Sequence, residues 1–434
     1  MDIFKLSWKN ILHKPLNSGL SVILMASGLS IIIVLLLTNH QITEKYEKNL
    51  AGVDLVIGAK GSPTDLILSS IYQVGNPTGN IKEQQTLMIK RNPFVEKTIP
   101  ISLGDSYKNY RIVGTNLEYL KLYDYSIEKG NLFENPMEVV IGSEVAKNTN
   151  LNIGSEFKGG HGVGEVLHEH DEFLYKVVGI LKKNNTVLDQ IIITPKESAW
   201  IVHSGHSDEG GSFELKSKEE VENDTTHQHE DEHHEHHHNH ASSIEEILEN
   251  LPEQKKEITA LLVFYKNQRA KFTIPGQVNN NSVMMAVEPQ IEVQKLKQIM
   301  SAGIDGITLM GYFILAISAV SVFISLYNSM KERVYEIALI RVMGASKVQV
   351  FLSVLAEGVL LSVFGCILGL LVSHFGMHVV AKLLQENYNY EFSGFVFLKE
   401  EIYLYAGALV IGIIASTIPA LMAYKTNISN VLNK

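Results

Sequence analysis

The chain has 434 residues, of which 45% are hydrophobic and 19% are charged, and its formal net charge is -10. This negative balance argues against nucleic acid as a partner, because a nucleic-acid surface needs a basic patch. The single cysteine, Cys366, excludes a disulfide within the chain.

Four apolar runs are long enough to cross a bilayer as helices, for which about 20 apolar residues are needed. They predict transmembrane helices over 16–38, 307–330, 351–380 and 402–424. The polar insert between the first two, 39–306, is large enough to fold with its own core. We therefore predict a membrane α-helical protein with a large, strand-rich α/β extracytoplasmic domain between its first and second spans.

Charge asymmetry sets the expected orientation. Nine Lys and Arg but only three Asp and Glu fall within the segments 1–15, 331–350 and 425–434 taken together. The loop 381–401 has the opposite balance, with two Lys and four Glu. The positive-inside rule therefore places both termini and 331–350 in the cytoplasm of a bacterial plasma (inner) membrane, and 39–306 outside. A cleaved signal peptide is the alternative for the first span. Its apolar run is too long and lacks a small-residue cleavage site, which favours an uncleaved anchor.

The composition of the insert changes along its length. Both ends, 41–50 and 292–300, carry helix-forming charged residues that continue the neighbouring spans. β-Branched runs broken by Asn and Gly predict short strands across 139–195, and the region 203–243 is a low-complexity loop within the domain. The pattern after the loop predicts a helix over 244–251 and a strand over 259–265.

The low-complexity loop contains a histidine-rich tract. Eight of the fourteen residues from 227 to 240 are histidine, interleaved with carboxylates. Neutral imidazole binds Zn²⁺ and other transition metals, so the tract is a candidate metal site, without any tightly bound cofactor. Its HExxH sequences lack the apolar helical setting of a zinc protease, which excludes that activity. The candidate ligands are His227, His229, His233, His234, His236, His237, His238 and His240.

A charged segment, NSMKERVYEIALIRVMGASKVQV (328–350), separates the second and third spans. Its pattern predicts a helix on which charged and apolar residues four apart, such as Arg333 and Ile337, share a face. Gly344 is expected to end this helix in a left-handed turn, and Ser346 to cap the next. A patterned helix at this position is typical of a contact surface; the alternative is a solvated positive loop.

The third span contains ionisable residues. Glu357 falls in its second turn, so a position near the inner surface is favoured over a role in coupling. His374 and His378 are four apart near the outer end and share a face. A metal-ligand role and an interfacial position are the alternatives for these two. Glycines along the same span predict close helix packing, with a dimer interface as one candidate site.

These features resemble those of the MacB/FtsX-like ABC transporter permease superfamily, an ABC3-type permease with a MacB-like periplasmic core domain. The resemblance rests on the order of spans and domain and on three stretches. They are KERVYEIALIRVMGAS in the charged segment, and VVIGSEVAKNTNLNIGSEF and YKVVGILKKNNTVLDQIIITP in the insert. The stretch GAKGSPTDLILSSIYQVGNPTGNI is similar to the HrtB-like branch. The last residues depart from the family, because 426–429 lacks a common proline.

The resemblance implies a permease homodimer in the lipid bilayer that is driven by a separate ABC ATPase subunit. It also makes a periplasmic adaptor or substrate protein a candidate partner. The chain has no Walker A motif, so it is not expected to be an enzyme itself. The residues that match the family's ATPase-coupling segment are Lys331, Glu332, Arg333, Glu336, Ile340, Arg341, Gly344 and Ala345.

Three function classes follow. The first is a permease that exports or extracts a metal-, heme-, peptide- or lipoprotein-related substrate. The second is a non-transporting mechanotransmission activator of an external enzyme. The third is a membrane-anchored zinc or transition-metal buffer or sensor. Replacing Glu336 and Arg341 separates the third from the others, because a buffer needs no coupling segment.

Overall fold

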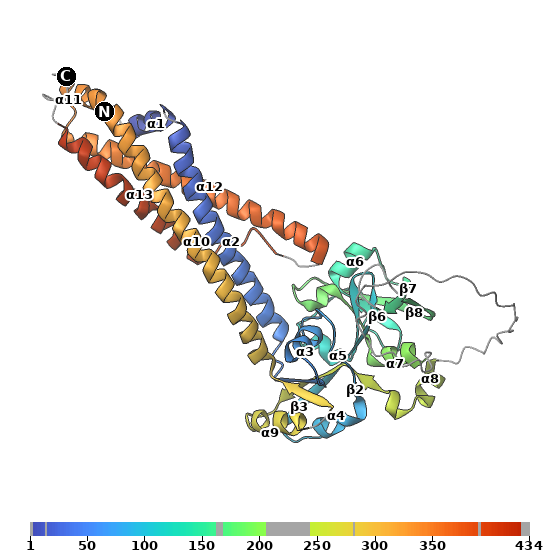
Figure 1. The fold of residues 1–434 in the computed structure, drawn as a ribbon. Coiled ribbons are helices and arrows are strands. Elements are labelled where there is room, and N and C mark those ends of the chain that lie inside the picture. The colour runs from blue at the N-terminus through green and yellow to red at the C-terminus, as the bar shows by residue number, and fades with distance from the viewer. Residues whose placement is uncertain are drawn as a thin grey trace, which may run out of the picture. The chain divides into compact units, whose positions relative to one another are not determined.

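A computed structural model describes residues 3–13, 15–161, 168–204, 244–280, 283–388 and 392–426. The chain folds as two compact units, one formed by Met1–Tyr46 with Gln294–Lys434 and the other by Glu47–Val293. Figure 1 shows a bundle of long helices in the first and a body of strands and short helices in the second. We call them the helical unit and the domain.

Long helices build the helical unit. They are α1 (Ile3–His13), α2 (Pro15–Leu50), α10 (Pro289–Glu332), α11 (Val334–Val342), α12 (Lys347–Tyr388) and α13 (Lys399–Lys425). Within the described ranges, four of these helices, α2, α10, α12 and α13, are long and apolar enough to cross a membrane. The predicted fold class is confirmed: four apolar helices, with a strand-rich α/β domain between the first and second.

Two of these helices extend far beyond their apolar runs. α2 continues past 16–38 to Leu50, and α10 begins at Pro289, well before 307–330. Helix-forming charged residues at both ends of the insert continue the spans, as the sequence predicts. The domain, Glu47–Val293, is therefore shorter in sequence than the polar insert 39–306, because the two ends of the insert belong to these helices.

Glycines of α12 allow close approach of other helices of the same chain. A Cβ on Gly358 would lie 2.4 Å from the Cβ of Ser416 in α13, and one on Gly365 would lie 2.9 Å from Met25 in α2. Gly369 likewise packs against the backbone of α2. The predicted close packing is confirmed. These three glycines serve packing within the chain, so they are not the predicted dimer interface.

Strands and short helices alternate along the domain. The strands are β1 (Leu55–Ala59), β2 (Ile81–Lys82), β3 (Val95–Tyr107), β4 (Tyr110–Thr115), β5 (Ile127–Gly130), β6 (Glu138–Ile141), β7 (Glu156–His161), β8 (His168–Leu181), β9 (Ile191–Pro195), β10 (Glu257–Ile258), β11 (Ala260–Tyr265) and β12 (Met284–Val287). The helices are α3 (Pro63–Ser70), α4 (Glu83–Lys90), α5 (Leu117–Lys121), α6 (Ser143–Thr149), α7 (Lys196–Ser204), α8 (Ile244–Asn250) and α9 (Arg269–Asn279), with 3-10 turns η1 (Val187–Gln190) and η2 (Glu253–Lys255).

One large mixed sheet forms the centre of the domain. In the described part of the chain its order is β12-β1-β11-β3-β4-β9-β6-β8-β5, with β7 pairing both β3 and β8. β4 pairs β9 in parallel, as does β6 with β8. Residues 139–141 and 191–193 are almost fully buried, because these β-branched strands pack inside the domain. The strands predicted within 139–195 and at 259–265 are confirmed.

Two helices that pack on one core flank the histidine-rich loop. Ile201 of α7 is fully buried in that core, and Ile247 and Leu248 of α8 pack against it. α8 confirms the helix predicted over 244–251 and ends at Asn250. Residues 205–243, which include all eight candidate metal ligands, lie outside the described residues.

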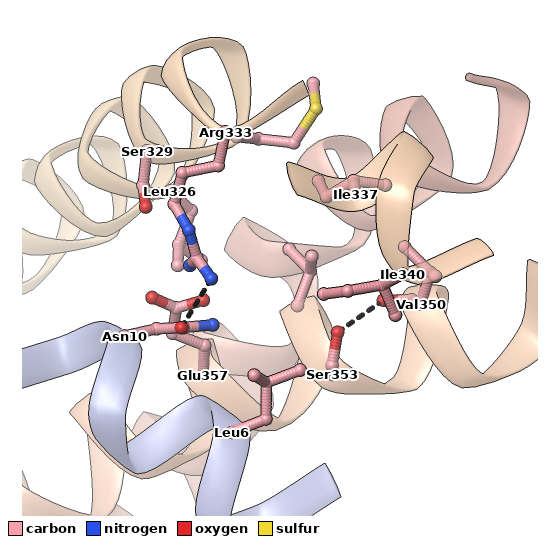
Figure 2. Close-up of a pocket in the computed structure, with 12 residues that line it drawn as sticks. Leu6, Asn10, Leu326, Ser329, Arg333, Ile337, Ile340, Val350, Ser353 and Glu357 are labelled. Atoms are coloured by element: carbon pink, nitrogen blue, oxygen red, sulfur yellow. Dashed lines mark hydrogen bonds between the residues drawn. The ribbon is translucent and has the colours of Figure 1, made fainter. Parts of the chain in front are cut away.

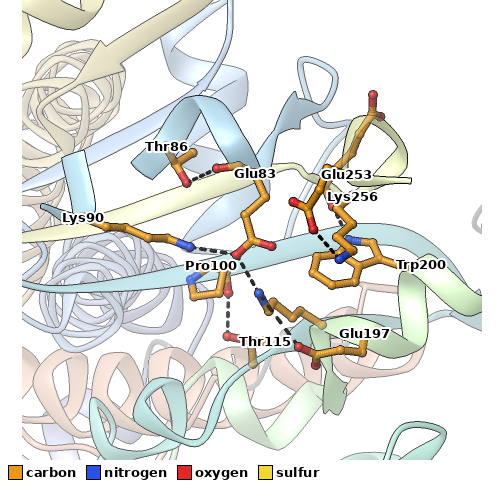
Figure 3. Close-up of polar contacts among 11 residues, drawn as sticks. Glu83, Thr86, Lys90, Pro100, Thr115, Glu197, Trp200, Glu253 and Lys256 are labelled. Atoms are coloured by element: carbon orange, nitrogen blue, oxygen red, sulfur yellow. Dashed lines mark hydrogen bonds and ion pairs between the residues drawn. The ribbon is translucent and has the colours of Figure 1, made fainter. Parts of the chain in front are cut away.

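A charged cluster joins α4 to α7 (Figure 3). Glu83 Oε1 accepts hydrogen bonds from Lys90 Nζ at 2.7 Å and from Lys196 Nζ at 2.6 Å. The Lys196 ammonium also lies over the ring of Trp200, 4.6 Å from its centroid. Burial alone would raise the pKa of Glu83, but the hydrogen bonds from both lysines outweigh it and leave the pKa below its ordinary value.

Glu83→Gln is expected to lower the domain's free energy of unfolding by about 2 kcal/mol at neutral pH, because two lysines lose their ionised acceptor. The folded-state pKa lies below the unfolded one. The stabilisation is therefore present above about pH 5 and is lost as the pH falls through the folded-state pKa. Fluorescence of Trp200 in a Trp8→Phe background measures it, since the chain has two tryptophans.

Glu253→Gln is the matched control for this prediction. Glu253 accepts from Lys256 at 2.6 Å, but its side chain is 67% exposed (Figure 3). An exposed pair is screened by water, so the change is expected to stay below about 0.5 kcal/mol. Equal losses in the two variants would contradict a special role for the Glu83 cluster.

Candidate functional site

The charged segment between the second and third spans folds as a corner of short elements. α10 ends at Glu332, Arg333 leaves helical geometry with φ -101° and ψ 12°, and α11 follows. The predicted single helix is therefore divided, with Lys331 and Glu332 in the last turn of α10. The break occurs at Arg333, whose backbone N–H bonds the carbonyls of both Ser329 and Met330.

The end of this corner follows the sequence prediction. Gly344 has φ +105°, a conformation that strains any residue with a Cβ. Ser346 and Gln349 then cap α12 reciprocally: Gln349 N–H donates to Ser346 Oγ at 3.2 Å, and Ser346 N–H donates to Gln349 Oε1 at 2.9 Å. This is a capping box, which satisfies two backbone donors of the new helix. Both predictions, the Gly344 turn and the Ser346 cap, are confirmed.

Three polar residues meet at the start of α11: Arg333 and Asn10 are half-buried and Glu357 is buried (Figure 2). We call them the Arg333 cluster. The Arg333 guanidinium donates to Asn10 Oδ1 of α1 through Nη2 and to Glu336 Oε2 through Nε, the latter at 3.0 Å. The Glu357 carboxyl of α12 points toward the same side chains (Figure 2). Helices α1 and α12 therefore meet the start of α11 through one polar cluster.

A small cavity opens beside the Arg333 cluster. Its volume of ≈ 20 Å³ is enough for a water molecule, and its polar lining supplies hydrogen-bond partners. Glu357 is only 5% exposed. The Glu357 carboxyl lies between helices and points toward Arg333 (Figure 2). Its predicted position near the inner surface stays a prediction.

The eight residues predicted for ATPase coupling do not share one surface. Arg333 and Ile340 line the cavity together with Ile337, which is buried. The expectation that Arg333 and Ile337 form a common contact face is thus wrong, because both point into the helical unit. Arg341 donates to the carbonyl of Thr426, and Ala345 is half-buried. The exposed members are Lys331, Glu332, Glu336 and Gly344.

The exposed face of α11 is apolar as well as charged. Tyr335, Leu339, Val342 and Met343 are 60%, 47%, 58% and 80% exposed. Tyr335, Leu339 and Met343 are four residues apart, and Val342 is three residues after Leu339, so all four lie on one side of α11 and its C-terminal cap. With Glu336 they form what we call the α11 face. Sequence analysis did not select these apolar residues, although their spacing was visible.

The two histidines of α12 contact the chain that leads into α13. The His374 ring is buried, with Nδ1 2.6 Å from the carbonyl oxygen of Gly394 and Nε2 3.2 Å from Glu401 Oε2. The ring also lies 4.5 Å from that of Phe397. His378 is exposed and packs its ring on Phe395 at 5.3 Å. The interfacial position predicted for these two histidines stays a prediction.

The hydrogen-bond chemistry of His374 fixes one of its protons. A carbonyl oxygen only accepts, so Nδ1 must donate to Gly394. Nε2 and the Glu401 carboxylate must then share one further proton, because two bare acceptors at 3.2 Å would repel each other. Glu401 also accepts from the backbone N–H of Leu398 at 3.0 Å. We call His374, Glu401 and Gly394 the His374 clamp. Both ring nitrogens of His374 are engaged, so neither faces an open metal position.

The candidate metal ligands of the histidine-rich tract, residues 227–240, lie outside the described residues. Among the residues that the structure does describe, no group of three or more His, Cys, Asp or Glu side chains is arranged to hold a metal ion.

Comparisons with known proteins identify two parts of the chain. Residues 18–228 match the family model of the MacB-like periplasmic core domain, and residues 308–428 match that of the FtsX-like permease C-terminal region. No curated protein matches the chain.

Two solved structures are similar to the chain at low identity. The periplasmic region of MacB from Actinobacillus actinomycetemcomitans is 10% identical, covers 58% of this chain and 98% of its own, and has a TM-score of 0.33. The extracellular domain of the ABC-type transporter YknZ from Gram-positive bacteria is 10% identical, covers 54% of this chain and 99% of its own, and has a TM-score of 0.30.

The two family matches follow the order of the fold. The first begins in α2 and covers strands β1 to β9, and the second begins in α10 and runs through α11, α12 and α13. The chain belongs to the MacB/FtsX-like ABC transporter permease superfamily.

Proposed function

We propose that the chain is the membrane subunit of an ABC transporter whose α11 face receives a separate ATPase subunit. The observation that supports this most strongly is the α11 face itself. Tyr335, Leu339 and Val342 of this nine-residue helix, and Met343 directly after it, are exposed beside Glu336. Apolar residues rimmed by charge are typical of a protein contact surface. The family implies an ATPase partner, and this chain has no Walker A motif of its own.

The connections of α11 favour transmission of movement. Arg333 at its start bonds α1 and faces Glu357 of α12, while Arg341 near its end bonds the residue after α13. A push on α11 would therefore act on three other helices at once. α2 and α10 are unbroken helices that continue from the helical unit to the residues where the domain begins and ends. Such helices are suited to carrying a displacement toward the extracytoplasmic domain.

Leu339→Asp/Met343→Asp is expected to reduce co-purification of the co-expressed ATPase subunit at least tenfold and to abolish permease-dependent ATP hydrolysis in nanodiscs. Two buried contacts would be replaced by charges that must be desolvated. Phe272→Asp on α9 is the matched control, since Phe272 is an exposed apolar residue of the domain. Undiminished ATPase binding by the α11 variant would overturn the proposal.

The same variants separate the remaining function classes. A transporter loses both ATPase binding and substrate efflux, whereas a non-transporting activator loses ATPase binding but shows no substrate-dependent efflux in any form. A metal buffer or sensor keeps its metal response without the α11 face. Homodimer formation and a periplasmic adaptor stay proposals that follow from the family.

The substrate class rests on the histidine-rich tract alone. Eight histidines within 227–240 favour zinc or another transition metal as cargo or regulator over heme, peptide or lipoprotein. Deletion of 227–240 distinguishes these cases when growth is compared under zinc, copper, heme and peptide challenge. A growth defect specific to zinc or copper supports a metal as cargo or regulator, and an unchanged response to both metals excludes that role.

A further inference from the structure

A short segment between α12 and α13, residues 392–398, is held by a helix that lies far from it in the sequence. We call this segment the strap. Gln41 of α2 is only 8% exposed, and its side-chain amide makes two bonds to one strap residue. Gln41 Nε2 donates to the carbonyl of Ser393 at 2.9 Å, and Gln41 Oε1 accepts from the Ser393 N–H at 2.7 Å. One side chain therefore satisfies both backbone groups of Ser393, as a neighbouring β-strand would.

A second residue of α2 contacts the strap one turn further along the helix. The Lys45 ammonium lies over the ring of Phe392, 5.5 Å from its centroid. Gln41 and Lys45 are four residues apart, so they lie on one face of α2. Both belong to the part of α2 that continues beyond the predicted span 16–38. The strap thus contacts the section of α2 that leads to the domain.

On its other side the strap fits closely against α12. A Cβ on Gly394 would lie 2.4 Å from the carbonyl oxygen of His374 and 2.8 Å from the backbone nitrogen of His378. Glycine is needed here, because any side chain would collide with the helix backbone. The Gly394 carbonyl accepts from His374 Nδ1 at 2.6 Å, and the Leu398 N–H donates to Glu401 Oε1 at 3.0 Å. The strap is therefore fixed to α12 and α13.

The two sides of the strap differ in how firmly they are held. Toward α12 and α13, Val396 and Leu398 pack against the hydrophobic core of the helical unit, and the strap runs directly into α13. Toward α2, the amide of Gln41 bonds the backbone of Ser393, which is exposed. Water can take the place of the amide at an exposed residue, so exchange of these bonds costs little. The contact with α2 is the one that can separate.

A small tilt of α2 is enough to separate it. α2 packs closely on α12 at Gly369, where a Cβ would lie 3.1 Å from Leu29, and Ser30 Oγ donates to the Gly369 carbonyl at 3.0 Å. At 1.5 Å per residue, Gln41 lies about 18 Å further along α2 than Leu29. A tilt of about 5° around the Gly369 contact would displace Gln41 by about 1.5 Å, which breaks both bonds to the strap.

We propose that the strap is a latch on α2. In the resting state the strap holds α2 through Gln41 and Lys45, and α2 must leave the strap before it carries movement to the domain. The strap contacts α12 at His374, about 40 Å along this helix from Lys347, its first residue next to α11. The inference rests on the proposed ATPase-driven function and adds a threshold to it. A displacement at α11 must be large enough to break contacts at the other end of α12.

A reversible cross-link tests the latch in the full-length protein. Cys366→Ser removes the sole cysteine, and Gln41→Cys/Ser393→Cys then places two thiols at the contact. In nanodiscs with the co-expressed ATPase subunit, a bifunctional methanethiosulfonate with a two-carbon spacer joins the thiols, and a reductant releases them. The cross-linked protein is expected to keep the ATPase subunit bound but to hydrolyse ATP about tenfold more slowly, because the cycle needs α2 to move. Reductant is expected to restore the rate.

Lys399→Cys/Tyr403→Cys in the Cys366→Ser background is the matched control. Both residues are exposed and lie four apart within α13. Their cross-link joins a helix to itself and leaves α2 free to move, so hydrolysis is expected to stay unchanged. Equal slowing by the control cross-link overturns the latch, since the reagent itself would then explain the effect.

Gln41→Met tests the latch in the opposite direction. Methionine has a similar length but makes neither bond to Ser393, so the resting state loses stability relative to the moving one. ATP hydrolysis without substrate is expected to rise about three- to tenfold, while co-purification of the ATPase subunit stays at the parent level. Hydrolysis no faster than in the parent, or a Gln41→Cys/Ser393→Cys cross-link that does not slow it, overturns the latch and leaves the proposed function standing. A parent protein that does not bind the ATPase subunit overturns the proposed function instead.

Discussion

Arg333→Ala is expected to destabilise the helical unit by about 1.5–3 kcal/mol, because hydrogen bonds from a charged donor are lost. The substitution leaves Asn10 and Glu336 without the guanidinium that donates to both. It also removes the arginine toward which the buried Glu357 carboxyl points (Figure 2). The melting temperature should fall by roughly 3–10 °C.

The single cysteine makes this loss measurable in detergent. Cys366 is half-buried in α12 and packs against the hydrophobic core of the helical unit, so a thiol-reactive fluorescent dye reports the unfolding of that unit. Lys331→Ala is the matched control, because it removes an exposed cation two residues away. A control that melts as early as Arg333→Ala would contradict a stabilising role for the Arg333 hydrogen bonds.

A double variant separates stability from coupling. Arg333→Met/Glu357→Leu replaces the pair by apolar side chains of similar size, and such replacements usually recover most of the stability. If the Arg333 cluster transmits movement from α11, permease-dependent ATP hydrolysis should stay low in the restored protein. Recovery of both stability and hydrolysis would show that the cluster serves packing alone.

His374→Ala is expected to cost about 3 kcal/mol, the second large effect. It removes one partner of Glu401, which is 2% exposed and keeps bonds from the Leu398 N–H and the Tyr405 hydroxyl, and it frees the carbonyl of Gly394. The chain between α12 and α13 would then lose the contact that holds it to α12. The Cys366 dye measures this loss, and a lower melting temperature is the expected result.

His378→Ala is the control for this second prediction. His378 lies one turn from His374 but is exposed, and its ring contacts Phe395. Its removal is expected to cost less than about 1 kcal/mol, because no buried polar group loses a partner. If both histidines cost the same, the His374 clamp is not a buried proton-sharing pair.

The two pairs show where sequence reasoning stopped. It marked Glu357 and His374 as unusual, because ionisable groups within an apolar run are costly. It assigned the first to an interface and left the second between a ligand and an interfacial position. Their partners are Arg333, Asn10 and Glu401, and Asn10 is 323 residues from Arg333 in the chain. A pattern of neighbouring residues cannot predict a contact between residues so far apart in the sequence.

The α11 face shows a subtler limit. The sequence predicted a helix between the second and third spans and its end at Gly344, but it expected Arg333 and Ile337 to face outward. Amphipathic spacing defines two sides of a helix without saying which side packs. The contacts of Arg333 with α1 and α12 turn that side inward and leave Tyr335, Leu339 and Met343 exposed.

The sequence by itself determined the four apolar helices, the strand-rich domain between the first two, the Gly344 turn and the Ser346 cap. Each of these depends on neighbouring residues, through hydropathy, strand alternation or capping, and so can be recognised locally. The tertiary structure alone decided the neighbours of the α12 glycines, the Arg333 cluster, the His374 clamp and the exposed side of α11. These depend on which helices pack together, because burial and pairing are properties of contacts between distant segments.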